Sequence, residues 1–150
     1  MSAISIFFGS VFGNSQNVAE KLHEHLNEKG VASEVITTPT IDDLVNAESI
    51  IVVSSTCGLG DIPPNLEELV EDARDQGIDL GAKSYAVAAL GDSSYVDTFC
   101  GGGEKVYAWL EELKGNPVTP LLRVDAIETF EPEIDVIAWA DGFVGDLVAA

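Results

Sequence analysis

Basic residues are scarce in this chain of 150 residues. Seven Lys and Arg stand against 26 Asp and Glu, which gives a formal net charge of −19. Such a balance repels nucleic-acid phosphates and anionic membrane surfaces, so neither is expected as a partner. Two interpretations of the carboxylates stay open: a surface that only aids solubility, or a field that steers a basic protein into brief contact.

Long hydrophobic runs and cysteines are also lacking. No apolar stretch approaches the roughly 18 residues that cross a bilayer, and residues 1–8 lack the basic start of a signal peptide. The two cysteines, Cys57 and Cys100, are too few for a disulfide framework. We therefore expect free thiols in a reducing compartment and a cytoplasmic location.

Apolar runs alternate regularly with helical patterns along the chain. Strands are predicted over residues 4–8, 35–37, 50–54, 85–90 and 121–124. Between and after them, apolar residues recur at helical spacing, as at Val18, Leu22 and Leu26. The alternation predicts one α/β domain over residues 1–150. Its expected architecture is a three-layer, doubly wound, five-stranded parallel sheet with strand order 2-1-3-4-5.

Ligands of such sheets bind beyond the carboxyl ends of the strands, where the winding reverses. The loop from Gly9 to Ser15 is rich in small polar residues and leads into a helix. Free amide N–H groups at that helix start would receive a phosphate. An ordinary helix cap is the alternative. The loop has neither the GxGxxG dinucleotide pattern nor a Walker A lysine, which excludes both of those sites.

Two further loops fall at the same predicted edge. Residues 54–64 carry Gly58 and Gly60 before a helix that starts at two prolines, a pattern that also suits an ordinary turn. Residues 90–103 set Tyr95 among small polar residues, where it could stack on a flat aromatic ligand or simply be a half-buried loop residue. Three unusual loops at one edge favour a ligand site.

Metal binding and nucleophilic catalysis are not expected. His23 and His25 are two residues apart on a predicted helix and point to different faces, whereas helical metal pairs prefer a spacing of four. Trp109 and Trp139 lie on apolar helix faces and are predicted to be core residues. An acidic residue is missing where strands one and three end, which excludes a phospho-receiver domain.

Three motifs carry a family resemblance: Gly-Ser-Val-Phe-Gly-Asn-Ser from residue 9, Ser-Ser-Thr-Cys-Gly-Leu-Gly-Asp from 54, and Ala-Leu-Gly-Asp-Ser-Ser-Tyr-Val-Asp-Thr-Phe-Cys from 89. Together they resemble the short-chain flavodoxins, above all the MioC-like branch and the FMN domains of diflavin reductases. The resemblance implies a flavodoxin-like fold that binds FMN. Phe12 and Cys57 depart from the family pattern, which often has a hydroxyl residue and an aromatic residue there.

The resemblance also implies which residues contact FMN. Gly58 would present its peptide to flavin N5, Tyr95 would stack on the ring, and Asp125 would lie near the same edge. The implied contacts are Ser10, Val11, Phe12, Gly13, Asn14 and Ser15 around the phosphate; Ser55, Thr56, Cys57, Gly58, Leu59 and Gly60; Leu90, Gly91, Asp92, Ser93, Ser94, Tyr95, Phe99 and Cys100; and Asp125.

The implied function is electron transfer by FMN between a basic NAD(P)H-dependent reductase, of the flavodoxin or ferredoxin–NADP reductase type, and an acceptor protein. The carboxylates expected to dock the reductase are Asp61, Glu67, Glu68, Glu71 and Asp72, although a solvated helix face would look the same. The alternatives are an FMN-dependent oxidoreductase acting on a small substrate such as a quinone, and a flavin-free interaction module.

Overall fold

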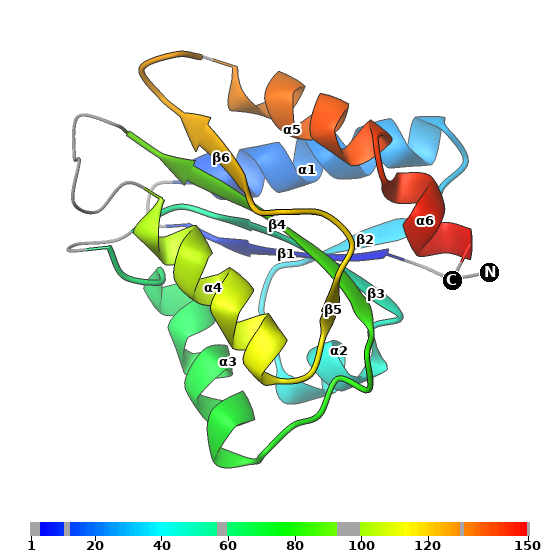
Figure 1. Ribbon diagram of the computed structural model, residues 1–150. Coiled ribbons are helices and arrows are strands. Elements are labelled where there is room, and N and C mark those ends of the chain that lie inside the picture. The colour runs from blue at the N-terminus through cyan, green and yellow to red at the C-terminus, as the bar shows by residue number, and fades with distance from the viewer. Residues whose placement is uncertain (1–3, 11–12, 57–59, 93–99, 130, 150) are drawn as a thin grey trace.

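The computed structural model describes residues 4–10, 13–56, 60–92, 100–129 and 131–149. It forms a parallel sheet between two layers of helices (Figure 1). The strands are β1 (Ile4–Gly9), β2 (Ser33–Ile36), β3 (Ser49–Ser54), β4 (Ser84–Gly91), β5 (Asn116–Pro117) and β6 (Leu122–Asp125). The helices are α1 (Asn14–Glu28), α2 (Ile41–Asn46), α3 (Pro64–Asp75), α4 (Gly101–Glu112), α5 (Pro132–Asp141) and α6 (Val144–Ala149).

The strand order β2-β1-β3-β4-β5 confirms the predicted doubly wound sheet. Every strand pair is parallel. The edge of the sheet differs in one respect from the prediction. Two short strands, β5 and β6, pair with β4 there in place of one continuous fifth strand. Pro117 lies opposite Tyr85 and Leu122 opposite Ala88. The edge chain thus advances five residues, from 117 to 122, while β4 advances three, from 85 to 88. The two extra residues interrupt the edge strand.

Two hydrophobic cores form because successive strand side chains point to opposite faces. Ile6, Phe8 and Ile51 pack against α1 and α5 on one face. Phe7, Ile50 and Val52 pack against α2, α3 and α4 on the other. Apolar residues therefore fill the central strands almost without a break, as expected of a sheet covered on both sides.

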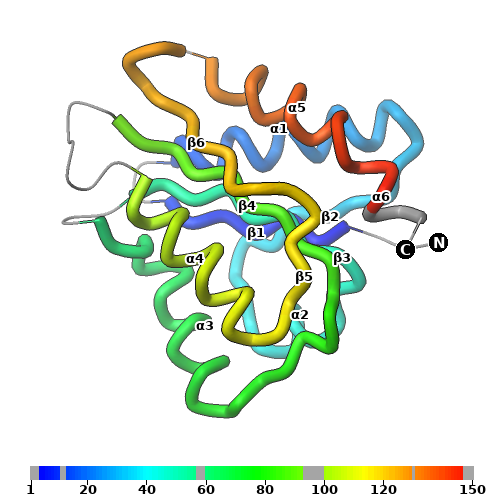
Figure 2. Tube along the Cα trace, in the orientation of Figure 1, coloured from blue at the N-terminus to red at the C-terminus, as the bar shows by residue number. Residues whose placement is uncertain are grey.

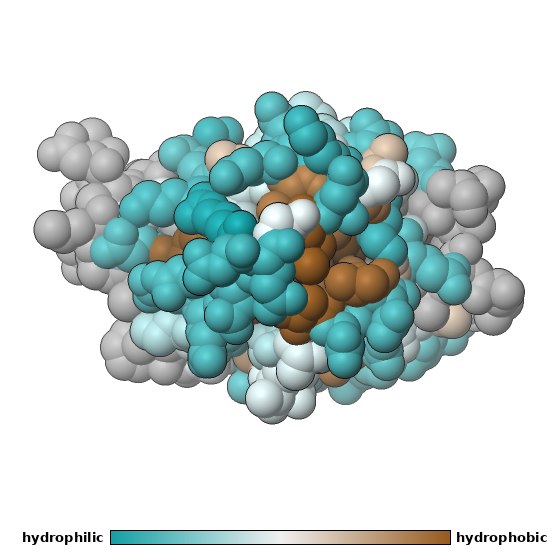
Figure 3. All heavy atoms as spheres, turned by 90° about the horizontal axis from the view of Figure 1, so that it is seen from below, coloured by the Kyte–Doolittle hydropathy of each residue, from teal (hydrophilic) through white to brown (hydrophobic). Residues whose placement is uncertain are grey.

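The helices carry the predicted apolar stripes with one difference. The last stripe is split into α5 and α6, which are separated at Gly142 and Phe143. Trp109 is buried in the core beneath the sheet. Trp139 is half-buried and packs edge-on against Phe143, with ring centroids 4.6 Å apart. The face seen in Figure 3 is mostly hydrophilic, with hydrophobic residues near its middle.

None of the helices in the part of the chain that the structure describes is long and apolar enough to cross a membrane.

Candidate functional site

The carboxyl ends of the central strands meet at one edge of the sheet, on the left of Figure 1. The pairing register places Gly9 beside Ser54, Ser54 beside Ala89, and Gly91 beside Asp125. The loops that follow these residues are the ones in which the sequence predicts a ligand site. The chain trace in Figure 2 shows β1, β3, β4 and β6 ending on this same side of the molecule.

The loop after β1 turns sharply into α1. The Ser10 hydroxyl accepts a hydrogen bond of 2.7 Å from the Gly13 amide, and Gly13 has φ +85°, a conformation that favours glycine. Gly13 also occupies the cap position of α1 and has no side chain with which to cap the first turn. The first-turn amides have no intrahelical acceptor. They and the helix dipole therefore provide an uncharged receptor for an anion.

Asn65, on the first turn of α3, holds this loop in place. Its Oδ1 accepts a hydrogen bond of 2.9 Å from the Ser10 amide, and its Nδ2 donates one of 2.7 Å to the Phe8 carbonyl. One side chain thus satisfies two backbone hydrogen-bonding groups, the carbonyl near the end of β1 and the amide at the start of the loop. Sequence reasoning missed this residue and used Pro63 and Pro64 only as a helix start. A side-chain amide directly after two prolines was the available signal.

A pair of hydroxyl groups joins the first two loops. The Ser15 and Ser55 Oγ atoms lie 2.6 Å apart, and Ser15 is fully buried. The Ser55 amide also donates a hydrogen bond of 2.8 Å to the Gly9 carbonyl. The Ser15 hydroxyl is therefore bonded to the second loop. The group that Ser15 can offer a ligand at the start of α1 is its backbone amide.

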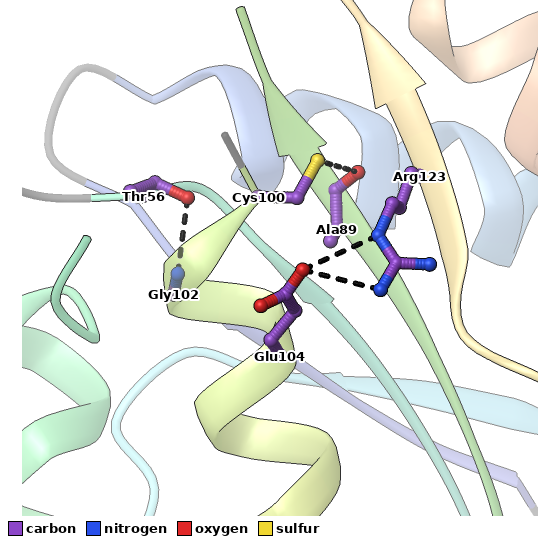
Figure 4. A network of polar contacts seen from close by, with 6 residues as sticks. All are labelled: Thr56, Ala89, Cys100, Gly102, Glu104 and Arg123. Atoms are coloured by element: carbon purple, nitrogen blue, oxygen red, sulfur yellow. Dashed lines mark hydrogen bonds and ion pairs between the residues drawn. The ribbon is translucent and has the colours of Figure 1, made fainter. Parts of the chain in front are cut away.

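The start of α4 packs closely on the second loop. The Gly102 amide donates a hydrogen bond of 3.1 Å to the Thr56 hydroxyl (Figure 4). A Cβ atom on Gly102 would lie 2.4 Å from the Ser55 carbonyl oxygen, and one on Gly101 would lie 2.9 Å from Gly60 Cα. Both distances are shorter than side-chain carbons tolerate, so glycine is required at this contact.

The third loop rejoins the fold at Cys100, which is fully buried. Its Sγ donates a hydrogen bond to the Ala89 carbonyl, with the two atoms 3.6 Å apart (Figure 4). Burial raises the pKa of the Cys100 thiol to about 11. The thiol is therefore protonated near neutral pH and is a poor nucleophile. Cys100 contributes packing at the base of the site.

Asp125 closes the edge of the site beside β4. The Ala126 amide donates a hydrogen bond of 2.8 Å to the Gly91 carbonyl, and Asp125 Oδ1 accepts one of 3.0 Å from the Ile127 amide. Its carboxylate therefore stabilises the turn that follows β6. This contact gives Asp125 a structural role at the position where the sequence predicts a contact with FMN.

Nearby cations are matched by carboxylates. Lys105 lies 2.8 Å from Asp61. Arg123 Nη2 lies 3.1 Å from Glu104 (Figure 4). Within the described residues, no three His, Cys, Asp or Glu side chains gather into a cluster that could hold a metal ion. Among the described residues, the donors that this leaves at the edge for a ligand are neutral amide and hydroxyl groups.

Twelve predicted site residues fall within the described chain, all at this edge: Ser10, Gly13, Asn14, Ser15, Ser55, Thr56, Gly60, Leu90, Gly91, Asp92, Cys100 and Asp125. Nine lie outside the described residues: Val11, Phe12, Cys57, Gly58, Leu59, Ser93, Ser94, Tyr95 and Phe99. The structure brings the described ends of the three predicted loops to the same edge of the sheet. The contacts of individual residues with FMN stay a prediction.

A doubly wound α/β sheet with a helix start beside its switch point is typical of proteins that bind a phosphate-bearing ligand there. The family model described as flavodoxin matches residues 6–139. The chain is 37% identical to Flavodoxin YqcA of Escherichia coli (94% of this chain, 95% of the relative). It is 33% identical to Protein MioC of the same organism (96% and 97%). A cysteine-to-serine mutant of flavodoxin from Pseudomonas aeruginosa superposes with a TM-score of 0.90 at 38% identity (97% and 98%).

The chain therefore belongs to the flavodoxin family, and the resemblance to short-chain flavodoxins of the MioC branch is confirmed. As a flavodoxin, it is an FMN-binding electron-transfer protein.

The residues at the edge suit that cofactor. FMN carries one phosphate dianion, which requires hydrogen-bond donors. The described loop supplies first-turn amides and the Ser10 hydroxyl. The described part of the loop therefore has hydrogen-bond donors of the kind that a phosphate requires.

Proposed function

We propose that this chain carries electrons from a basic NAD(P)H-dependent reductase to an acceptor protein. In this proposal Ser10, Gly13 and the first turn of α1 hold the FMN phosphate, and the loops after β3 and β4 hold the ring. The observation that carries it is the uncharged loop at the start of α1, whose cap residue is a glycine in the left-handed conformation.

Bound FMN supplies the redox chemistry, and the protein positions and tunes it. Asn65 fixes the backbone of the phosphate loop through Ser10 and Phe8. The Ser15–Ser55 pair and the Thr56–Gly102 contact fix the second loop against α1 and α4. These contacts would hold the site in shape before a ligand arrives, which lowers the cost of binding.

Charge would set the direction of transfer. The net charge of −19 and the neutral donor set disfavour further negative charge at the site. A reduced site would then give up electrons readily. The same excess of carboxylates would steer a basic partner, and Glu67, Glu68, Glu71 and Asp72 on α3 are all exposed. Asp61, also expected to dock the reductase, forms an exposed ion pair with Lys105.

A cytoplasmic location fits this role. It would keep the free Cys100 thiol reduced. NAD(P)H-dependent reductases that could supply electrons also act there.

The visible absorption spectrum of the purified protein, before and after FMN is added, tests the binding step. We expect flavin bands that remain with the protein on gel filtration. Reduction by a basic NADPH-dependent flavodoxin reductase should then slow as salt rises, because exposed charges are screened. A chain that retains no FMN would refute the proposal, and a rate independent of salt would remove the steering role.

A further inference from the structure

Large hydrophobic side chains are exposed at few positions in the described part of the chain. Three of them stand out: Ile127 at 57%, Ile134 at 55% and Val45 at 45%. Single exposed hydrophobics are common. Two within eight residues, both more than half exposed, are less so, because apolar surface of this kind usually marks a contact with another molecule.

The two isoleucines belong to the cofactor edge of the molecule. Ile127 follows Asp125, the last residue of β6, and the intervening Ala126 amide is hydrogen-bonded to Gly91 at the end of β4. Ile134 lies in the first turn of α5, into which the chain passes from β6 (Figure 1). Val45 is on α2, which leads into the amino end of β3. The isoleucine pair is therefore near the proposed FMN site, and Val45 is not.

The charge around the pair has one sign. Residues 125–135 contain five carboxylates and no Lys, Arg or His, and no basic residue follows Arg123 in the sequence. Arg123 is itself paired with Glu104. Glu128, Glu131 and Asp135 are exposed. A partner surface that fits this composition is basic at its rim with an apolar centre, which is the general pattern of protein interfaces.

Helix α3, the other acidic face near the site, is different. Its Arg74 pairs with Glu112, and the neighbouring Asp61 pairs with Lys105. Its described hydrophobic residues, such as Leu66 and Val70, are buried. The α3 face has charge for steering, but none of its described residues is an exposed large hydrophobic side chain.

We propose that Ile127 and Ile134, with the carboxylates Glu128, Glu131 and Asp135, form the surface that contacts a basic redox partner. This set of five residues is the β6–α5 surface. The proposal rests on the proposed function and assigns its docking contact to this surface, while the α3 carboxylates act at longer range. Residues at the centre of an interface govern how long a complex lasts, and rim charges govern how fast it forms.

The test measures binding of the FMN-loaded protein to an immobilised basic NADPH-dependent flavodoxin reductase. The double variant Ile127→Ser/Ile134→Ser should raise Kd at least about tenfold, mainly through faster dissociation. Val45→Ser is the matched control, because it removes a comparably exposed hydrophobic residue from the other end of the sheet, and it should leave Kd unchanged. Glu67→Gln/Glu71→Gln on α3 should slow association at low salt and leave dissociation unchanged.

Flavin absorbance and thermal unfolding of each variant show whether a loss of reductase binding comes from the docking surface or from a loss of FMN or of the fold. Both should match the wild type, because the substituted side chains are exposed. If the double variant binds the reductase as tightly as the wild type while FMN is retained, the β6–α5 surface is refuted and the electron-transfer role stands. The proposal is also overturned if Val45→Ser weakens reductase binding as much as the double variant does. It is overturned likewise if only the α3 substitutions speed dissociation.

Discussion

The Asn65 side chain bridges the two residues that flank Gly9, accepting from the Ser10 amide at 2.9 Å and donating to the Phe8 carbonyl at 2.7 Å. The end of β1 and the start of α3 are thereby fixed to each other. Close packing supports the link, because a Cβ on Gly9 would lie 2.9 Å from Leu66 Cδ1. The shape of the phosphate loop thus depends on a residue 55 positions away in the sequence.

Replacement of this bridge should weaken phosphate binding selectively. Asn65→Ala removes both hydrogen bonds, and we expect FMN affinity to fall by about 1–2 kcal/mol, the scale for such contacts. Riboflavin, which lacks the phosphate, should lose much less. Fluorescence titration of both ligands measures the difference. Asn46→Ala, an exposed amide on α2, is the control. Equal losses for the two ligands would contradict a role in positioning the phosphate loop.

The glycines at the start of α4 should tolerate no side chain. A Cβ on Gly102 would lie 2.4 Å from the Ser55 carbonyl, and one on Gly103 would lie 2.2 Å from Ala89 Cβ. We expect Gly102→Ala and Gly103→Ala each to lower the unfolding free energy by about 1–3 kcal/mol, the usual cost of overpacking. Urea denaturation measures this.

Gly145 provides the matched control for these substitutions. It lies in α6 and has no atom of the described chain within 4 Å of an added Cβ. Because alanine favours helix more than glycine does, Gly145→Ala should be neutral or stabilising by up to roughly 1 kcal/mol. A loss at Gly145 equal to that at Gly102 would show that crowding is not the cause.

The buried thiol of Cys100 should make stability fall at high pH. Burial raises its pKa from 9.0 to about 11, so the unfolded chain loses this proton before the folded protein does. The unfolding free energy should therefore decrease between about pH 9 and pH 11, by on the order of 1–3 kcal/mol. Cys100→Ala should lose this part of the pH dependence. An unchanged profile in that variant would contradict the assignment.

The same thiol should resist alkylation in the folded state. In a Cys57→Ser background, iodoacetamide at about pH 8 should modify Cys100 only after denaturant is added, because the thiol is buried and protonated. Mass spectrometry before and after unfolding measures the difference. Modification at equal rates in both states would show that Cys100 is accessible.

A three-residue contact between α1 and α5 should respond to acid. Asp141 Oδ1 lies 2.9 Å from His25 Nε2 and 3.1 Å from Lys29 Nζ. The hydrogen bond from His25, with a smaller contribution from Lys29, lowers the pKa of Asp141. The contact therefore stabilises the fold above the usual Asp range, and this stability is lost as pH falls through the lowered pKa.

The substitution Asp141→Asn tests this sign. Because the groups are partly exposed, the loss at about pH 7 should stay under about 1 kcal/mol. It should shrink at about pH 3 or below, where the wild-type carboxylate also becomes protonated. Urea unfolding at both pH values makes the comparison. A difference that grows as the pH falls would contradict the assignment.

Much of the fold could be predicted because its signals are local. The apolar runs that became β1, β3 and β4 are nearly continuous, and stripes such as Val18, Leu22 and Leu26 have helical spacing. The interruption between β5 and β6 could not be predicted, because the pairing with β4 decides it. The break after Asp141 falls at Gly142 and is followed by Phe143, which is buried in the core.

The site likewise has some features that local sequence patterns predict and others that depend on tertiary contacts. Loops after strand ends can be located from the sequence, and Ser10, Ser55 and Asp125 do lie at one edge. Asn65, by contrast, acts through the backbone of Phe8 and Ser10 at the far end of β1, and the two prolines before it mark only the start of a helix. The same holds for the glycines of α4, whose requirement arises from the nearby carbonyl of Ser55.

The interrupted edge of the sheet affects how the protein behaves at high concentration. An uninterrupted outer strand would offer its open amide and carbonyl groups to a second molecule, and chains could add to one another edge to edge. Here Pro117 lacks an amide hydrogen, β5 has two residues and β6 has four. Such a broken margin gives a neighbouring strand little to extend, which protects the protein from aggregation through this edge.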